Sequence, residues 1–210
     1  MITAFKIFGE RHTGTNVIQQ FVSLNFNLEA KYYEYLGWKH RLAPDDLELR
    51  KYNTENTLFI FTFRSPYSWL KAMHREPYYS HFPGMTQLSF DEFITFQIED
   101  YENSISMWNK KNKSYLELSR KVPKALIINL EEFRLNQSKI FQSLNSILET
   151  DIQEMKSITS YIYGRGIIKE RDIDENIFMD NLGPRNLDTI NSLLDFNIMA
   201  ELGYSKMEQI

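Results

Sequence analysis

Two glycines separated by four residues mark the first segment of the sequence that could do chemistry. Gly9 and Gly14 lie between a short apolar run typical of a buried strand and a stretch with apolar residues at helical spacing. A strand-to-helix turn of this kind collects backbone N–H groups that bind phosphate. Thr15 and Asn16 follow, where a nucleotide triphosphatase has a lysine for the outer phosphates and a hydroxyl for Mg²⁺. The loop is therefore predicted to bind a phosphate-like group without magnesium; an ordinary tight turn is the alternative.

The composition is that of a globular α/β protein. The chain has 210 residues, of which 42% are apolar and 14% aromatic, enough to bury a full core in one domain spanning residues 1–210. It has no cysteine, which excludes disulfides, thiolate metal sites and a cysteine nucleophile.

Charge and hydropathy exclude several partners. With 24 basic against 28 acidic residues, the chain has no electrostatic footprint for nucleic acid. The first strand follows Met1 too closely for a signal sequence, and no apolar run reaches membrane-spanning length. We therefore expect a cytoplasmic protein without stable membrane insertion. No sequence pattern indicates its oligomeric state.

Strand and helix patterns alternate along the chain. Strands are predicted at residues 5–8, 32–39, 57–63 and 124–130, and helices at residues 17–26, 45–52, 66–75, 89–111, 131–148, 152–161, 188–194 and 197–202. Ser65 and Pro66 supply an N-cap and a first-turn proline for the helix after the third strand. This order predicts a three-layer α/β fold like that of P-loop NTPases, with a central parallel sheet flanked by helices. The carboxyl ends of its strands would share one crevice.

Three motifs at predicted strand ends resemble the sulfotransferase superfamily that uses 3′-phosphoadenosine 5′-phosphosulfate. They are His-Thr-Gly-Thr-Asn at residues 12–16, Lys39-His40, and Arg64-Ser65-Pro66. In that family the first motif holds the 5′-phosphosulfate, the second supplies catalytic groups and the third contacts the 3′-phosphate. Looser matches at residues 130–133 and 202–204 extend the resemblance over nearly the whole chain. The resemblance implies sulfuryl transfer to a hydroxyl acceptor, either a glycan or a small alcohol, with adenosine 3′,5′-bisphosphate as the other product and no metal.

The resemblance also assigns roles to residues. Those implied to bind the 5′ end of the donor share the loop: Arg11, His12, Thr13, Gly14, Thr15 and Asn16. Either Arg11 or His12 would neutralise the leaving oxygen, and Lys39 would hold the transferring sulfonate. His40 is the candidate base, because imidazole titrates near neutral pH and an attacking hydroxyl must lose its proton. A surface histidine is the alternative for His40.

Arg64 is the candidate ligand of the 3′-phosphate, with a surface cap or ion pair as the alternative. The family's serine eight residues later is Ala72 here, and Ser68, one turn earlier, is expected to substitute. Arg165, between Gly164 and Gly166, is predicted to close over the nucleotide, with a plain turn as the alternative for this segment. Lys169 and Arg171 compete for the same role.

Two other classes of protein remain open. A kinase or nucleotide hydrolase is disfavoured by Thr15 and Asn16, and Mg²⁺ dependence would reveal it. A non-catalytic protein binding another phosphorylated ligand is kept open by Ala72 and by His12, which stands where the family has lysine. The aromatic loop at residues 78–82 would line the acceptor site, a feature that suits a sugar or an aromatic alcohol. A hydrophobic clasp over the core is the alternative for this loop.

Overall fold

The computed structural model describes residues 1–77, 84–163, 167–170 and 182–208, and of residues 161–163 and 167–170 it describes only the backbone. The chain divides into two compact units. One comprises residues 1–63 and 114–173, and the other residues 64–113 and 174–210. The single domain expected from the sequence stays a prediction.

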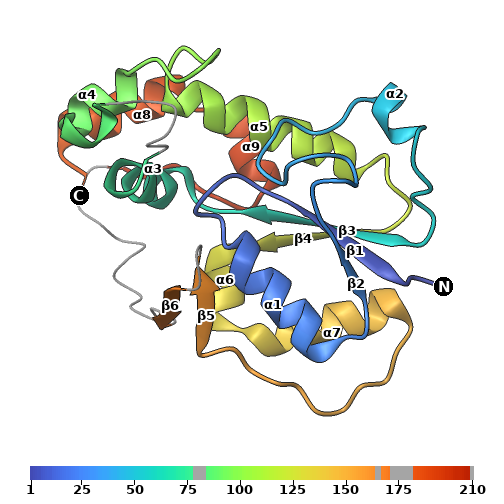
Figure 1. Cartoon of the computed structure of the whole chain (residues 1–210). Coiled ribbons are helices and arrows are strands. Elements are labelled where there is room, and N and C mark those ends of the chain that lie inside the picture. The colour runs from blue at the N-terminus through green and yellow to red at the C-terminus, as the bar shows by residue number, and fades with distance from the viewer. Residues whose placement is uncertain (78–83, 164–166, 171–181, 209–210) are drawn as a thin grey trace. The chain divides into compact units, whose positions relative to one another are not determined.

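A four-stranded parallel sheet forms the centre of the first unit (Figure 1). Its strands are β1 (Ala4–Phe8), β2 (Glu29–Lys31), β3 (Thr57–Phe63) and β4 (Ala125–Asn129), in the order β2-β1-β3-β4. All three pairings are parallel, so each connection is a crossover. β3 is buried along its whole length, as expected for an interior strand of apolar residues. The predicted α/β class with a central parallel sheet is confirmed.

Helices flank this sheet. One face is covered by α1 (Thr15–Asn25), α6 (Leu130–Leu135) and α7 (Gln137–Leu148), as Figure 1 shows. The core on this side includes Phe21 and Phe133, whose ring centroids lie 5.2 Å apart. On the other face, Tyr115 near the end of α5 (Ser104–Ser119) lies 6.2 Å from Phe8 between ring centroids. The short helix α2 (Asp46–Leu49) lies in the connection from β2 to β3.

The second unit is helical in the part that the structure describes. It contains α3 (Pro66–Arg75), the 3₁₀ turn η1 (Met85–Gln87), α4 (Phe90–Thr95), most of α5, α8 (Pro184–Leu193) and α9 (Phe196–Glu201). Trp69 and Trp108 are fully buried. α3 begins at Pro66 as predicted, but the side chain of Ser65 makes no cap hydrogen bond.

The strand predicted at residues 32–39 is wrong. β2 ends at Lys31, and residues 33–36 form a turn in which Leu36 and Gly37 have φ values of 61° and 77°. The cause is a distant residue: the Lys6 ammonium donates to the carbonyls of Tyr32, at 2.5 Å, and Gly37, at 2.8 Å. These two bonds hold the ends of the turn together. Strand propensity is weak and depends on context, so the contacts of Lys6 decide the conformation here.

Three predicted helices are also corrected. The helix expected at residues 131–148 is two helices, α6 and α7, because Asn136 between them is not helical and caps α7 through its side chain. The helix expected at residues 89–111 is two helices, α4 and α5; α4 begins at the predicted cap Ser89 but its C-cap Phe96 is extended. The helix expected at residues 152–161 is irregular to residue 158 and then enters β5 (Ser160–Tyr163), which pairs with β6 (Ile167–Glu170). Here the Gln137 amide takes both backbone groups of Ile158, donating to its carbonyl and accepting from its N–H, and so replaces a helical turn.

Over the described ranges, no helix has both the length and the apolar character needed to cross a bilayer.

Candidate functional site

The loop between β1 and α1 has the strand-to-helix geometry expected from its glycines. His12 and Gly14 adopt left-handed φ values of 65° and 87°. The buried hydroxyl of Thr13 donates to the Glu10 carbonyl at 2.6 Å and shares a hydrogen bond of 2.7 Å with Thr62 of β3. A Cβ at Gly9 would lie 2.0 Å from the Thr62 hydroxyl oxygen. The loop therefore lies directly against the central strand, and only glycine fits at position 9.

The backbone of this loop presents donors at the start of α1. No acceptor among the described residues takes the N–H groups of Gly14, Thr15 or Asn16, and the helix has no side-chain cap. Successive N–H groups in a loop with left-handed residues form a concave anion site, reinforced by the helix dipole. The N–H of Thr13, by contrast, donates to Glu10, and the Thr13 hydroxyl is used within the fold. The open donors are therefore those of residues 14–16.

The Lys39-His40 segment is connected to this loop by a pair of hydrogen bonds, one to each residue. The Gly9 N–H donates to the Lys39 carbonyl at 3.0 Å, and the Nδ1 atom of His40 lies 2.5 Å from the Gly9 carbonyl oxygen. A carbonyl only accepts, so Nδ1 carries the proton and the lone pair of the neutral ring is on Nε2. The ring is buried, with 8% of the residue exposed. His40 is thus an oriented imidazole, not a freely rotating surface side chain.

Lys39 contacts the first turn of α1, directly after the loop. Its Nζ donates to the Asn16 side-chain oxygen at 2.5 Å, at the first turn of α1. Burial lowers the pKa of Lys39 from 10.5 to about 8, because the ammonium loses hydration. A desolvated ammonium beside open N–H donors concentrates positive potential at one point.

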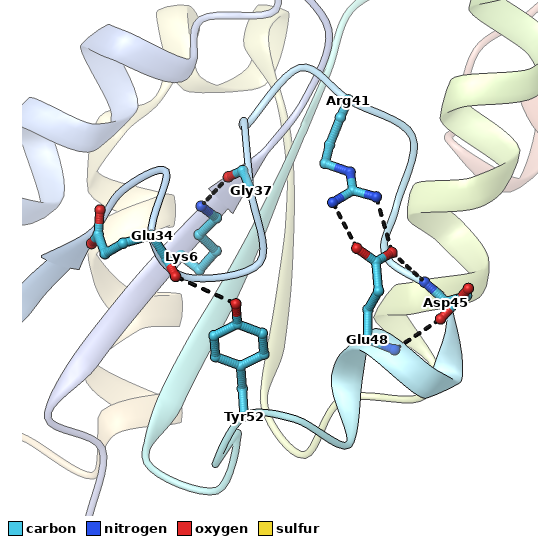
Figure 2. Close-up of polar contacts among 7 residues, drawn as sticks. All are labelled: Lys6, Glu34, Gly37, Arg41, Asp45, Glu48 and Tyr52. Carbon is cyan, nitrogen blue, oxygen red and sulfur yellow. Dashed lines mark hydrogen bonds and ion pairs between the residues drawn. The ribbon is translucent and has the colours of Figure 1, made fainter.

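The segment that carries Lys39 and His40 is fixed on both sides, as Figure 2 shows. Before the pair, Lys6 donates to Gly37. After it, the Arg41 guanidinium makes two hydrogen bonds of 2.9 Å to the carboxylate of Glu48, which also completes the capping box of α2 with Asp45 (Figure 2). The Tyr115 hydroxyl donates to the Arg41 carbonyl at 2.7 Å. These bonds restrain the two predicted catalytic residues although neither lies in a helix or strand.

Arg64, the first residue after β3, belongs to the second unit. Its Nε donates to the Ser68 hydroxyl at 3.0 Å, and both residues are almost completely buried. The Trp108 indole donates to the Arg64 carbonyl at 3.2 Å. Ala72, one turn after Ser68, is buried and brings no hydroxyl. Ser68 therefore orients the Arg64 guanidinium from its own helix.

Within the first unit, the structure brings the loop, Lys39 and His40 together; within the second it joins Arg64 to Ser68. Arg11 and His12 lie half-buried in the loop. Arg165 and Arg171 lie outside the described residues, as do residues 78–83 of the aromatic loop, and only the backbone of Lys169 is described. The roles predicted for all of these residues stay predictions.

Lys6 is the residue at this site that sequence reasoning missed. It is 1% exposed, and it was counted only as part of a buried strand. A lysine among four apolar residues in a strand was the available signal, because a buried ammonium requires several acceptors.

Among the described residues, no group of three His, Asp or Glu side chains could hold a metal ion.

Comparison with known proteins gives little further information. No protein-family model matches the sequence, and no curated protein does. A similar solved structure is the sulfotransferase domain from the Synechococcus PCC 7002 olefin synthase, with 15% identity and a TM-score of 0.41. The match covers 77% of this chain and 55% of that one, so this chain matches about half the length of that structure.

Proposed function

We propose that this protein is a sulfotransferase that moves a sulfuryl group from 3′-phosphoadenosine 5′-phosphosulfate to a hydroxyl acceptor. The observation that supports this most is the contact between His40 and Gly9. It joins an imidazole of defined tautomer to a loop with open anion-binding donors.

The residues of the loop fit the 5′ end of such a donor. The loop offers three backbone N–H donors at the positive end of the α1 dipole, next to the Lys39 ammonium. Donors and positive charge of this kind suit a phosphosulfate. Thr15 and Asn16 stand in place of the Lys and Ser/Thr of a Walker loop, so the loop suits an anion bound without Mg²⁺. Arg64, oriented by Ser68, is suited to the 3′-phosphate.

The donor supplies a sulfuryl group: a bond forms from the acceptor oxygen to sulfur, the bond from sulfur to the 5′-phosphate oxygen breaks, and its electron pair stays on that phosphate. His40 takes the acceptor's proton on Nε2, because Nδ1 is already committed to the Gly9 carbonyl. Lys39 and the N–H groups of residues 14–16 stabilise the negative charge on the equatorial oxygens, as donors do in phosphoryl transfer. Arg11 or His12 neutralises the leaving oxygen.

A non-catalytic protein that binds another phosphorylated ligand is the second candidate. Ala72 favours it, because this buried position lacks the hydroxyl expected for a 3′-phosphate contact. Turnover separates the two candidates.

The test is a transfer assay with the sulfonate donor and a panel of sugar and alcohol acceptors, in the presence of a metal chelator. Sulfated product that disappears in His40→Asn supports the proposal. Tight nucleotide binding with no product from any acceptor favours the non-catalytic alternative.

A further inference from the structure

A cavity of about 310 Å³ lies at the edge of the sheet beside the loop. It is bounded by β1, the first turns of α1, the end of β2 and the turn that follows. Its lining is formed by Phe5, Lys6, Ile7, Asn16, Gln19, Ala30, Lys31, Tyr32, Tyr33, Trp38 and Lys39. The space exists because β2 stops at Lys31 while β1 continues to Phe8. All of these residues belong to the first unit.

The charge of this lining has one sign. It includes Lys6, Lys31 and Lys39 but no aspartate or glutamate. Two carboxylates lie next to the lining. Glu29 pairs with Lys31 at 2.6 Å, with a side chain that is 68% exposed, and Glu34 accepts from the Tyr32 N–H at 3.1 Å. A cavity with three ammonium groups and no lining carboxylate attracts an anion.

Several donors in the cavity are not used within the fold. Among the described residues, Lys39 makes one hydrogen bond, to Asn16, and Lys6 makes two, whereas an ammonium has three N–H groups. Lys6 is almost completely buried, so its remaining donor is costly without an acceptor. These donors can be satisfied by a bound carboxylate or sulfate, directly or through water.

The cavity also has aromatic walls. Tyr32, Tyr33 and Trp38 are 57%, 74% and 42% exposed, although large aromatic side chains are usually buried. The Tyr32 hydroxyl accepts from Gln19, which orients that ring at the rim. Exposed flat rings next to donors are typical of sites that bind a ring-shaped ligand.

The position of the cavity connects it to the proposed chemistry. Two of its lining residues, Asn16 and Lys39, bond to each other at the start of α1. A third, Trp38, has its ring centroid 5.0 Å from that of His40. A ligand in the cavity would therefore adjoin both the anion loop and the candidate base.

We infer that this cavity binds the acceptor, and that the acceptor is a small ring compound with a fixed negative charge as well as its hydroxyl. The inference rests on the proposed sulfotransferase function. The ring can come from a sugar acid or from a hydroxylated aromatic acid, since both combine a hydroxyl and a carboxylate with a ring face that can pack on an aromatic side chain.

Calorimetry on the full chain without any nucleotide tests the binding step. The probes are methyl glucuronoside against methyl glucoside, and 4-hydroxybenzoate against 4-methylphenol, each pair differing in one carboxylate. At least one acid should bind about tenfold or more tightly than its neutral partner, and the better pair identifies the source of the ring. Equal affinity within both pairs, or no binding by either acid, would overturn the inference.

A pair of charge variants tests the location. Lys31→Gln removes a charge from the lining of the cavity. Lys124→Gln is the control: Lys124 lies just before β4 and outside the lining, and like Lys31 it pairs with a glutamate. Lys31→Gln should weaken binding of the acid about fivefold, the effect of one partly exposed ion pair, and Lys124→Gln should leave it unchanged. Equal effects of the two variants would mean that binding follows net charge and not this cavity.

Binding of adenosine 3′,5′-bisphosphate to the same samples separates the two levels of the proposal. Nucleotide binding without acid binding overturns the cavity assignment alone. Acid binding without nucleotide binding overturns the sulfotransferase function, and with it the acceptor role of the cavity.

Discussion

The Nδ1 atom of His40 lies 2.5 Å from the carbonyl oxygen of Gly9. This one contact fixes the tautomer of a buried imidazole and attaches it to the loop that presents open N–H groups at residues 14–16. The candidate base and the loop are therefore held in one arrangement by a backbone group. No substrate is needed to bring them together.

Replacement of His40 separates its two roles. The amide nitrogen of His40→Asn can occupy the place of Nδ1 and keep the bond to Gly9, but the variant has no base. We expect turnover to fall 10²–10⁴-fold, the usual contribution of a general base, with unchanged nucleotide affinity in calorimetry. His40→Ala also loses the bond to Gly9 and should be less stable than His40→Asn in urea unfolding. Turnover of His40→Asn close to wild type would remove the residue from the mechanism.

Arg64 should discriminate nucleotides by their 3′-phosphate. Removal of a charged hydrogen-bond donor costs about 1.5–3 kcal/mol, or roughly 10- to 150-fold in affinity. Arg64→Ala should weaken adenosine 3′,5′-bisphosphate by this factor and leave adenosine 5′-monophosphate nearly unaffected. Arg64→Lys keeps the charge but lacks the Nε donor to Ser68, so we expect an intermediate loss. If both nucleotides weaken equally, Arg64 does not contact the 3′-phosphate.

Lys6 should make the free energy of unfolding depend on pH in the alkaline range. Burial, the largest cause, lowers its pKa from 10.5 to about 8, with Glu34 opposing the shift and Lys39 and Arg41 adding to it. Between about pH 8 and 10.5 the unfolded chain holds the proton that the folded chain has released, so the free energy of unfolding rises with pH. Lys6→Met lacks this contribution.

The measurement is urea unfolding of wild type and Lys6→Met from pH 7.5 to 10. The stability advantage of wild type over the variant should increase across this range. A constant or shrinking advantage would show that Lys6 keeps its ordinary pKa in the fold.

Gly14 is required both for its backbone conformation and for space. Its φ is 87°, and a Cβ would lie 2.5 Å from the Cδ1 atom of Leu130. Gly203 at the end of α9 has φ 77° with no atom within 4 Å of such a Cβ, so it serves as a matched control. Gly203→Ala should cost about 1 kcal/mol in the free energy of unfolding, the cost of left-handed backbone. Gly14→Ala should cost at least 1 kcal/mol more, because Leu130 must move. Equal losses of stability in Gly14→Ala and Gly203→Ala would show that the Leu130 side chain moves aside without a measurable cost.

The elements that could be predicted are those specified by local sequence. Residues 57–63 and 66–75 were predicted with the bounds that the structure has, because a continuous apolar run and a first-turn proline are local signals. The loop between Gly9 and Gly14 was also predictable, since its glycines meet steric requirements that no other residue satisfies.

The elements that could not be predicted depend on distant partners. Residues 32–39 have the aromatic composition of a strand, but the Lys6 ammonium, at least 26 positions away, closes them into a turn. Residues 152–158 have helical spacing, but the Gln137 amide binds both backbone groups of Ile158 and the segment is irregular. The turn closed by Lys6 forms part of the cavity. The sequence therefore indicated Lys39 and His40 as candidate residues but not the cavity beside them.

The most direct test of the account is calorimetry with adenosine 3′,5′-bisphosphate in a buffer that contains a metal chelator. The account predicts tight binding that added Mg²⁺ does not strengthen, because the loop offers N–H groups and Lys39 in place of a metal site. Absence of binding, or binding that requires Mg²⁺, would contradict it.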